Sequence, residues 1–260
     1  MAKKKNDYAL NLEEKIEMVR MSVRAVTRGY KISRTIIGPP GIGKSHAVKK
    51  ELELEALDNP DLKVVFFSGG IKDQVSFYTM LCDNNDKNTI VVLDDINVVI
   101  TNKDCRELLR QATENILERP ITYASNRIVR GKTFYKPKTV FHSKVIIITN
   151  ISTKKIDRGI LSRTSPIEID TSPQETYAWV GKNLENAPPH KMPFKWKEEV
   201  YSFIGKEVGI ENLKQFDFRV FEDAMLWYGS CVNTKGIDDR GDKKIVVNEK
   251  WKNYVYTMCI

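Results

Sequence analysis

A glycine-rich loop, Gly38 to Ser45, constrains this chain more than any other feature, because it stands between a predicted strand at 34–37 and a predicted helix at 46–52. Glycines let a backbone fold tightly around a phosphate and point successive N–H groups at it. Lys44 brings a positive charge to the β- and γ-phosphates, and the Ser45 hydroxyl can complete the shell of a Mg²⁺ ion. The dipole of the following helix adds to this attraction.

The loop therefore predicts that the chain binds a nucleoside triphosphate, ATP, together with Mg²⁺. The residues expected around the nucleotide are Gly38, Pro39, Pro40, Gly41, Ile42, Gly43, Lys44, Ser45 and His46.

Short apolar runs alternate with helical patterns over the first 170 residues, which predicts a parallel five-stranded α/β sheet between helices. The run at 63–67 is apolar nearly throughout and predicts a strand covered on both faces. After residue 170 the pattern changes to helices only, at 174–184, 196–208 and 212–232. We expect a nucleotide-binding domain over 1–170 and a small all-helical domain over 171–260. The predicted strands are 34–37, 63–67, 89–93, 144–150 and 166–169, and the other predicted helices include 12–28, 104–118 and 157–162.

Composition narrows the class of protein. The chain has no apolar run of about 18 residues, so we expect no membrane span and no membrane partner. The four cysteines share no metal-ligand spacing, which favours free thiols in a reducing compartment such as the cytoplasm. A net charge of +8 over 260 residues suggests a polyanionic partner.

An acidic pair follows the predicted strand at 89–93. Asp94 is placed to bind Mg²⁺ with Ser45, and Asp95 to polarise the attacking water as a general base. A paired acidic turn is the alternative.

Asn150 ends the strand at 144–150, where a neutral amide can position the attacking water or the γ-phosphate. A strand-terminating turn is the alternative there.

Together these stretches resemble an AAA+ ATPase over roughly residues 10 to 235. The loop at 38–45 corresponds to the Walker A motif, and the acids after Leu93 correspond to the Walker B motif. The segment 148–150 corresponds to sensor 1, and the segment 161–163 corresponds to the arginine-finger motif. The helical tail resembles the AAA+ lid domain, with 218–221 as its sensor 2 helix. The chain is most similar to small bacteriophage-encoded AAA+ proteins and shares traits with superfamily 3 helicases.

The resemblance implies roles for three arginines. Arg163 would reach the γ-phosphate of a neighbouring protomer, with Arg158 as the runner-up, and Arg219 would reach back from the lid to the nucleotide. Solvated surface charges are the alternative. A finger supplied in trans implies a homo-oligomeric ring, most often a hexamer. The family usually has Asp-Glu where this chain has Asp94 and Asp95, so hydrolysis is expected to be slow or its geometry adjusted.

No Asp or Glu occurs between Arg119 and Lys155, although nine Lys and Arg residues do. Segments 121–125 and 138–141 are predicted to pair as a basic hairpin inserted near 121–141. Its cations would contact nucleic-acid phosphates, and Phe134 or Tyr135 would stack on bases. A solvated loop packed on a neighbouring subunit is the alternative. The expected contacts are Arg127, Arg130, Lys132 and Lys136, with Ile71 and Lys72 from a second loop that could equally be a helix-capping turn.

These features favour a ring-forming AAA+ ATPase that couples ATP hydrolysis to remodelling or translocation of DNA or RNA, in phage DNA replication and with replication proteins as partners. One alternative is a protein remodeller or helicase loader. Another is a nucleotide-gated scaffold with little turnover, and a small-molecule kinase fits least.

Overall fold

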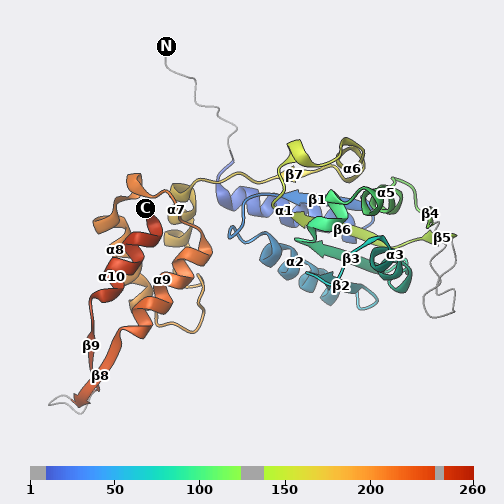
Figure 1. The fold of residues 1–260 in the computed structure, drawn as a ribbon. Coiled ribbons are helices and arrows are strands. Elements are labelled where there is room, and N and C mark those ends of the chain that lie inside the picture. Colours follow the sequence, from blue (N-terminus) through green and yellow to red (C-terminus); the bar gives the residue numbers. More distant parts are fainter. Residues whose placement is uncertain (1–9, 124–137, 238–242) are drawn as a thin grey trace. The chain divides into compact units, whose positions relative to one another are not determined.

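The computed structural model describes residues 10–123, 138–237 and 243–260, which form two compact units (Figure 1). The larger unit comprises residues 14–39 and 43–170. The smaller comprises residues 171–260 with the short segments 10–13 and 40–42. Each unit has its own hydrophobic core.

A five-stranded parallel sheet forms the centre of the larger unit, with the strand order β2-β3-β6-β1-β7. Successive residues of an inner strand face opposite sides of a sheet. In β3 and β6 both sets are buried, so helices cover both faces. This confirms the predicted parallel α/β sheet. The strands are β1 (Ser33–Ile37), β2 (Lys63–Phe67), β3 (Thr89–Asp94), β6 (Lys144–Thr149) and β7 (Ile167–Glu168).

Strand β2 lies at one edge of this sheet, which corrects the prediction of a strand covered on both faces. Lys63 and Phe66 are exposed and the other three residues are only half-buried. A run of four apolar residues has the same appearance in an inner strand and in an edge strand. Position in the sheet depends on partners far away in the chain, so the local pattern could not reveal it.

The helices predicted at 12–28 and 157–162 begin and end close to their predicted bounds, whereas the helix predicted at 46–52 continues to Asp58 and a short helix at 97–101 was not predicted. Helix α5 is capped by Asn102, whose side chain accepts the N–H groups of Asp104 and Cys105, but it ends at Ala112 rather than near residue 118. The six residues beyond it lead into the next strand. The helices are α1 (Leu12–Thr27), α2 (Lys44–Asp58), α3 (Gln74–Asp83), α4 (Asn97–Thr101), α5 (Lys103–Ala112) and α6 (Arg158–Thr164).

A two-stranded antiparallel hairpin, β4 (Arg119–Thr122) and β5 (Lys138–Phe141), precedes β6. This confirms the predicted strand pair. Ile121 and Phe141 are fully buried in the core of the larger unit and fix the base of the hairpin there. The predicted contacts between residues 124 and 137 lie outside the described residues.

The smaller unit is largely helical, as predicted, and it also contains a hairpin that the expectation of helices only did not include. Phe221, Tyr228 and Trp251 are buried at its centre. None of the described helices is both long and apolar enough to cross a membrane. The elements are α7 (Pro173–Lys182), α8 (Phe194–Phe203), α9 (Phe218–Ser230), β8 (Val232–Ile237), β9 (Lys243–Val247) and α10 (Lys250–Cys259).

Two buried glutamates of α2 join this helix to α1. Glu51 pairs with Arg24, and Glu55 pairs with Arg28 at 2.9 Å and also accepts the Thr27 hydroxyl. Burial alone would raise the pKa of Glu55, but the hydrogen bonds from Arg28 and Thr27 hold it below its ordinary value of 4.5. The ionised carboxylate therefore stabilises the packing of the helix that follows the phosphate loop.

The Glu55→Gln variant removes this charge while keeping the size of the side chain. We expect its free energy of unfolding at pH 7 to fall by about 1–2 kcal/mol. Because the folded pKa of Glu55 is the lower one, the wild-type advantage is present above pH 4.5 and shrinks as the pH falls below it. Urea denaturation at several pH values measures this. Glu53→Gln, on the exposed side of α2, is the control, and an equal loss at every pH would contradict the assignment.

Candidate nucleotide and magnesium site

The phosphate loop connects the end of β1 to the start of α2, at the carboxyl edge of the sheet. The Gly38 N–H donates to the Thr149 carbonyl at the end of β6, at 3.2 Å, which ties the loop to the neighbouring strand. Gly41 and Gly43 have φ of 74° and 83°, in the left-handed region that favours glycine. Gly43 caps α2 without a side-chain hydrogen bond, so the first-turn amides can serve a ligand.

Lys44 folds back along this loop. Its ammonium group donates to the carbonyls of Gly38 at 2.8 Å and Pro39 at 2.6 Å, and the residue is 8% exposed. The positive charge is thus held against the loop backbone by neutral carbonyls. Phosphate oxygens carry negative charge and make stronger hydrogen bonds to an ammonium group than carbonyls do. The position fits a phosphate ligand.

Ser45 and Asp94 meet where α2 starts and β3 ends. The Ser45 hydroxyl donates to Oδ1 of Asp94 at 2.9 Å. Burial raises the pKa of Asp94 and the charge of Asp95 adds to this, while the Ser45 hydroxyl and Lys44 act in the opposite direction. A hydroxyl and a carboxylate are hard oxygen ligands of the kind Mg²⁺ prefers. A carboxylate whose charge is disfavoured by burial also gains from a cation, so the pair fits Mg²⁺.

Asp95 and Asn150 follow neighbouring strands at the same edge of the sheet. Asp94 pairs with Ile148 in the β3–β6 register, which brings the two strand ends together. Asp95 is exposed, its N–H donates to the Ile148 carbonyl at 2.9 Å, and its φ of 54° is uncommon outside glycine. Asn150 is exposed directly after β6. Both side chains come from the edge that carries the phosphate loop, and their roles in catalysis stay predictions.

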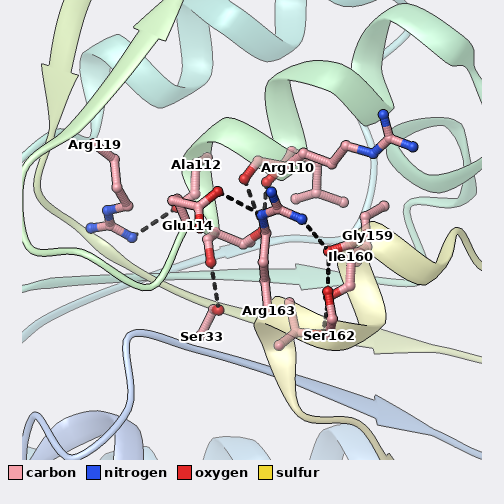
Figure 2. A network of polar contacts seen from close by, with 12 residues as sticks. Ser33, Arg110, Ala112, Glu114, Arg119, Gly159, Ile160, Ser162 and Arg163 are labelled. Carbon is pink, nitrogen blue, oxygen red and sulfur yellow. Dashed lines mark hydrogen bonds and ion pairs between the residues drawn. The ribbon is translucent and has the colours of Figure 1, made fainter.

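Arg163 on α6 is engaged by its own chain (Figure 2). Its Nε donates to Glu114 at 2.7 Å and its Nη1 donates to the Gly159 carbonyl at 2.8 Å, which leaves the side chain 31% exposed. Sequence reasoning missed Glu114. It lies 49 positions from Arg163, just after α5, and no local pattern points to the pairing. Arg158, at the start of α6, is exposed.

The second predicted contact loop is a helix-capping turn. Asp73 and Ser76 form a capping box at the start of α3, and the Lys72 N–H donates to the Ser76 hydroxyl at 3.0 Å. Ile71 is 8% exposed and packs in the core of the larger unit. Little of the Ile71 side chain is therefore accessible, whereas Lys72 is exposed, and the predicted nucleic-acid contacts of both residues stay predictions.

Arg219, the remaining predicted site residue, lies in the first turn of α9 in the smaller unit and is exposed. Its approach to the nucleotide stays a prediction. Arg127, Arg130, Lys132 and Lys136 lie outside the described residues.

The strand order, the loop after β1 and the acids after β3 define the class: this is the fold of the AAA+ P-loop ATPases. The chain superposes on RuvB of Thermotoga maritima with a TM-score of 0.53 at 13% identity, covering 94% of this chain and 68% of RuvB. PCH-2 of C. elegans gives a TM-score of 0.47 at 11% identity, covering 95% of this chain and 66% of PCH-2.

In sequence, the chain is similar to an uncharacterised 36.7 kDa protein of enterobacteria phage T4, from the nrdC-mobD intergenic region. The two are 23% identical over 154 residues, which covers 59% of this chain and 46% of the phage protein. The match thus spans less than half of that relative. No protein-family model matches the chain.

The Asp94→Asn variant separates stability from metal binding. Because burial raises the pKa of Asp94, its charge opposes folding in the absence of a cation, and the neutral amide can still accept the Ser45 hydroxyl. We expect a slightly higher Tm without ligand and loss of the further rise that Mg²⁺ with ATP gives the wild type. Differential scanning calorimetry measures both. A retained rise with Mg²⁺ and ATP would remove Asp94 from the metal site.

Proposed function

We propose that the protein is an AAA+ ATPase that assembles into a ring and couples ATP hydrolysis to remodelling of, or translocation along, nucleic acid in phage DNA replication. The observation that carries the ATPase assignment is the 2.9 Å contact between the Ser45 hydroxyl and the Asp94 carboxylate. It joins two magnesium-type ligands beside the phosphate loop. The similarity to a phage T4 protein supports the phage setting.

In this proposal the loop amides and Lys44 bind the β- and γ-phosphates. Ser45 and Asp94 hold Mg²⁺, which supplies charge that neutralises the phosphate oxygens. Asp95 accepts a proton from the attacking water, and Asn150 orients that water against the γ-phosphate. An exposed Asp95 in a left-handed conformation is consistent with a carboxylate directed away from the sheet, toward solvent.

Arg163 completes the site of a neighbouring protomer, and Arg219 contacts the nucleotide from the lid. The Arg163 guanidinium would exchange the Glu114 carboxylate for a γ-phosphate oxygen. Because the carboxylate and the phosphate are both anions, the guanidinium has a negatively charged partner before and after this exchange. An arginine that acts in trans requires an oligomer, and we propose a hexameric ring because that is the most frequent ring in the family that the sequence resembles.

Nucleic acid is expected to stimulate ATP hydrolysis several-fold. ATPase rates with and without single- and double-stranded DNA and RNA, read alongside the oligomeric mass, measure this. The Lys132→Ala/Lys136→Ala double variant should keep the basal rate and lose the stimulation, because those cations contact phosphates. Lys44→Ala should abolish both. Hydrolysis that no nucleic acid stimulates would favour a protein remodeller, and absence of hydrolysis would favour a nucleotide-gated scaffold.

Removal of the Arg163 guanidinium is expected to lower turnover by about 10³-fold while nucleotide affinity is kept, because the arginine acts on the charge of the transition state. Glu114→Gln, which releases Arg163 without removing it, should retain or raise the rate. Arg158→Ala is the matched control on the same helix. Steady-state ATPase assays and nucleotide titrations separate these outcomes, and full activity of Arg163→Ala with loss in Arg158→Ala would transfer the role to Arg158.

A further inference from the structure

A cavity of about 350 Å³ lies in the larger unit at the edge of the sheet opposite the phosphate loop. Its walls include Ile32 and Lys144, where β1 and β6 begin, whereas the nucleotide site lies where these strands end. Strands of five or six residues separate the two edges by about 15–20 Å. The described residues that line it are Gly29, Lys31, Ile32, Lys87, Leu117, Glu118, Arg119, His142 and Lys144.

The charge of this lining is strongly unbalanced. The lining residues include four Lys or Arg residues and a single acidic residue, Glu118, and His142 adds further hydrogen-bonding capacity. Leu117 is 80% exposed, so the cavity has an apolar rim as well as cationic walls. Small-molecule sites have volumes of about 300–1,000 Å³ and combine apolar surface with a few convergent polar groups. The cavity has the dimensions and the chemistry of such a site.

Arg119 is the most deeply buried of these cations, at 1% exposed. It comes from the basic stretch of the sequence, where a solvated or nucleic-acid-binding surface was expected. Its Nη1 donates to the Ala112 carbonyl at 2.8 Å and its Nη2 to the Ser143 carbonyl at 2.6 Å (Figure 2 shows the first bond). Its Nε has no hydrogen-bond partner among the described residues.

Lys144 is a second, half-buried cation of the cavity. Its ammonium group donates to the Thr27 carbonyl at 2.8 Å. Burial lowers the pKa of Lys144, and it lowers the pKa of Arg119 to about 10. No carboxylate of the described residues forms an ion pair with either side chain. Buried Lys and Arg are normally paired, because an uncompensated charge in the interior costs several kcal/mol. Neutral carbonyls satisfy some donors here but supply no counter-charge.

We propose that this cavity binds a phosphate group, with Lys144 and the rim lysines Lys31 and Lys87 as its ligands and the buried Arg119 as a fixed positive charge behind them. A phosphate brings several strong acceptor oxygens and up to two negative charges, which matches cations that lack carboxylate partners. The phosphate belongs either to a small phosphorylated molecule or to the backbone of a nucleic-acid strand. Both sources present the same chemistry, and the site does not depend on the ATPase assignment.

The three histidines of the chain make a site-specific test possible, because only His142 lines the cavity. His46 adjoins the phosphate loop and His190 lies in the smaller unit. The probe is inorganic phosphate, then pyrophosphate, added to the Lys44→Ala protein so that the nucleotide site contributes little. Imidazole NMR signals, assigned with His142→Gln, report the binding. We expect the His142 signal to shift saturably while that of His190 stays unchanged.

Substitutions of charged residues on the cavity rim should change the affinity for pyrophosphate in opposite directions, and they leave the buried arginine in place. Lys87→Gln, an exposed residue, should raise the Kd for pyrophosphate at least five-fold, and Glu118→Gln should lower it because the opposing charge is gone. Lys63→Gln on the edge strand β2 is the matched control and should leave the Kd unchanged. Shifts confined to His46, or a Kd that ignores both rim substitutions, would overturn the proposal.

A single-stranded oligonucleotide distinguishes the two sources of the phosphate. If it shifts His142 and Lys87→Gln weakens its binding, the ligand is a backbone phosphate. If only the free anions act in this way, the ligand is a small phosphorylated molecule. If neither the free anions nor the oligonucleotide shifts the His142 signal saturably, the site is rejected, whatever the ATPase assays show.

Discussion

The parallel pairing of β1, β3 and β6 is the constraint on which the candidate site depends. In this register Ile37 lies opposite Thr149 and Asp94 lies opposite Ile148, so three strands end at one edge. Backbone bonds from Gly38 and Asp95 to β6 extend the pairing beyond the strands. A shift of one residue along a strand would displace Asp94 by about 3.3 Å. The hydroxyl of Ser45, 2.9 Å from its carboxylate, would then be out of reach.

Several features of the candidate site at this edge lower the stability of the folded protein when no ligand is bound. Burial disfavours the charge of Asp94, the left-handed backbone of Asp95 is uncommon for a residue with a side chain, and Lys44 is held against neutral carbonyls. A cation beside Asp94 and a phosphate beside Lys44, as proposed above, would lower this cost. Strands β3 and β6, buried except for one half-buried residue at an end of each, supply the packing that offsets this cost.

Features carried by short, continuous segments could be predicted from the sequence. The glycine-rich loop between β1 and α2, the parallel sheet and the pairing of β4 with β5 each depend on a local pattern, and the described residues contain all three. Features that depend on distant partners could not be predicted. Ile71 looked like a loop residue but packs in the core, Arg119 looked like a surface cation but is buried, and Glu114 meets Arg163 only because α5 and α6 are neighbours. Burial and pairing are properties of the assembled fold, and local periodicity does not encode them.

Helix α6 has a firmly held first turn and, in its last turn, an arginine whose ion-pair partner can be exchanged. Arg110 and Asp157 are joined at 2.6 Å, and the Asp157 carboxylate also accepts N–H groups of Gly159 and Ile160, so the start of α6 is firmly held. The pKa of Asp157 is accordingly lowered, chiefly by Arg110.

Arg163 and Glu114 differ from that pair in the acid, because Glu114 is 42% exposed and Asp157 is 21% exposed, whereas the two arginines are exposed to a similar extent. Ion pairs with this much exposure contribute about 0–1 kcal/mol. An arginine that acts on a neighbouring protomer needs a rigid base and a resting partner that it can leave at little cost. The contacts of α6 are compatible with the trans role proposed for Arg163, because the first turn is anchored and the partner of the last turn is weakly bound.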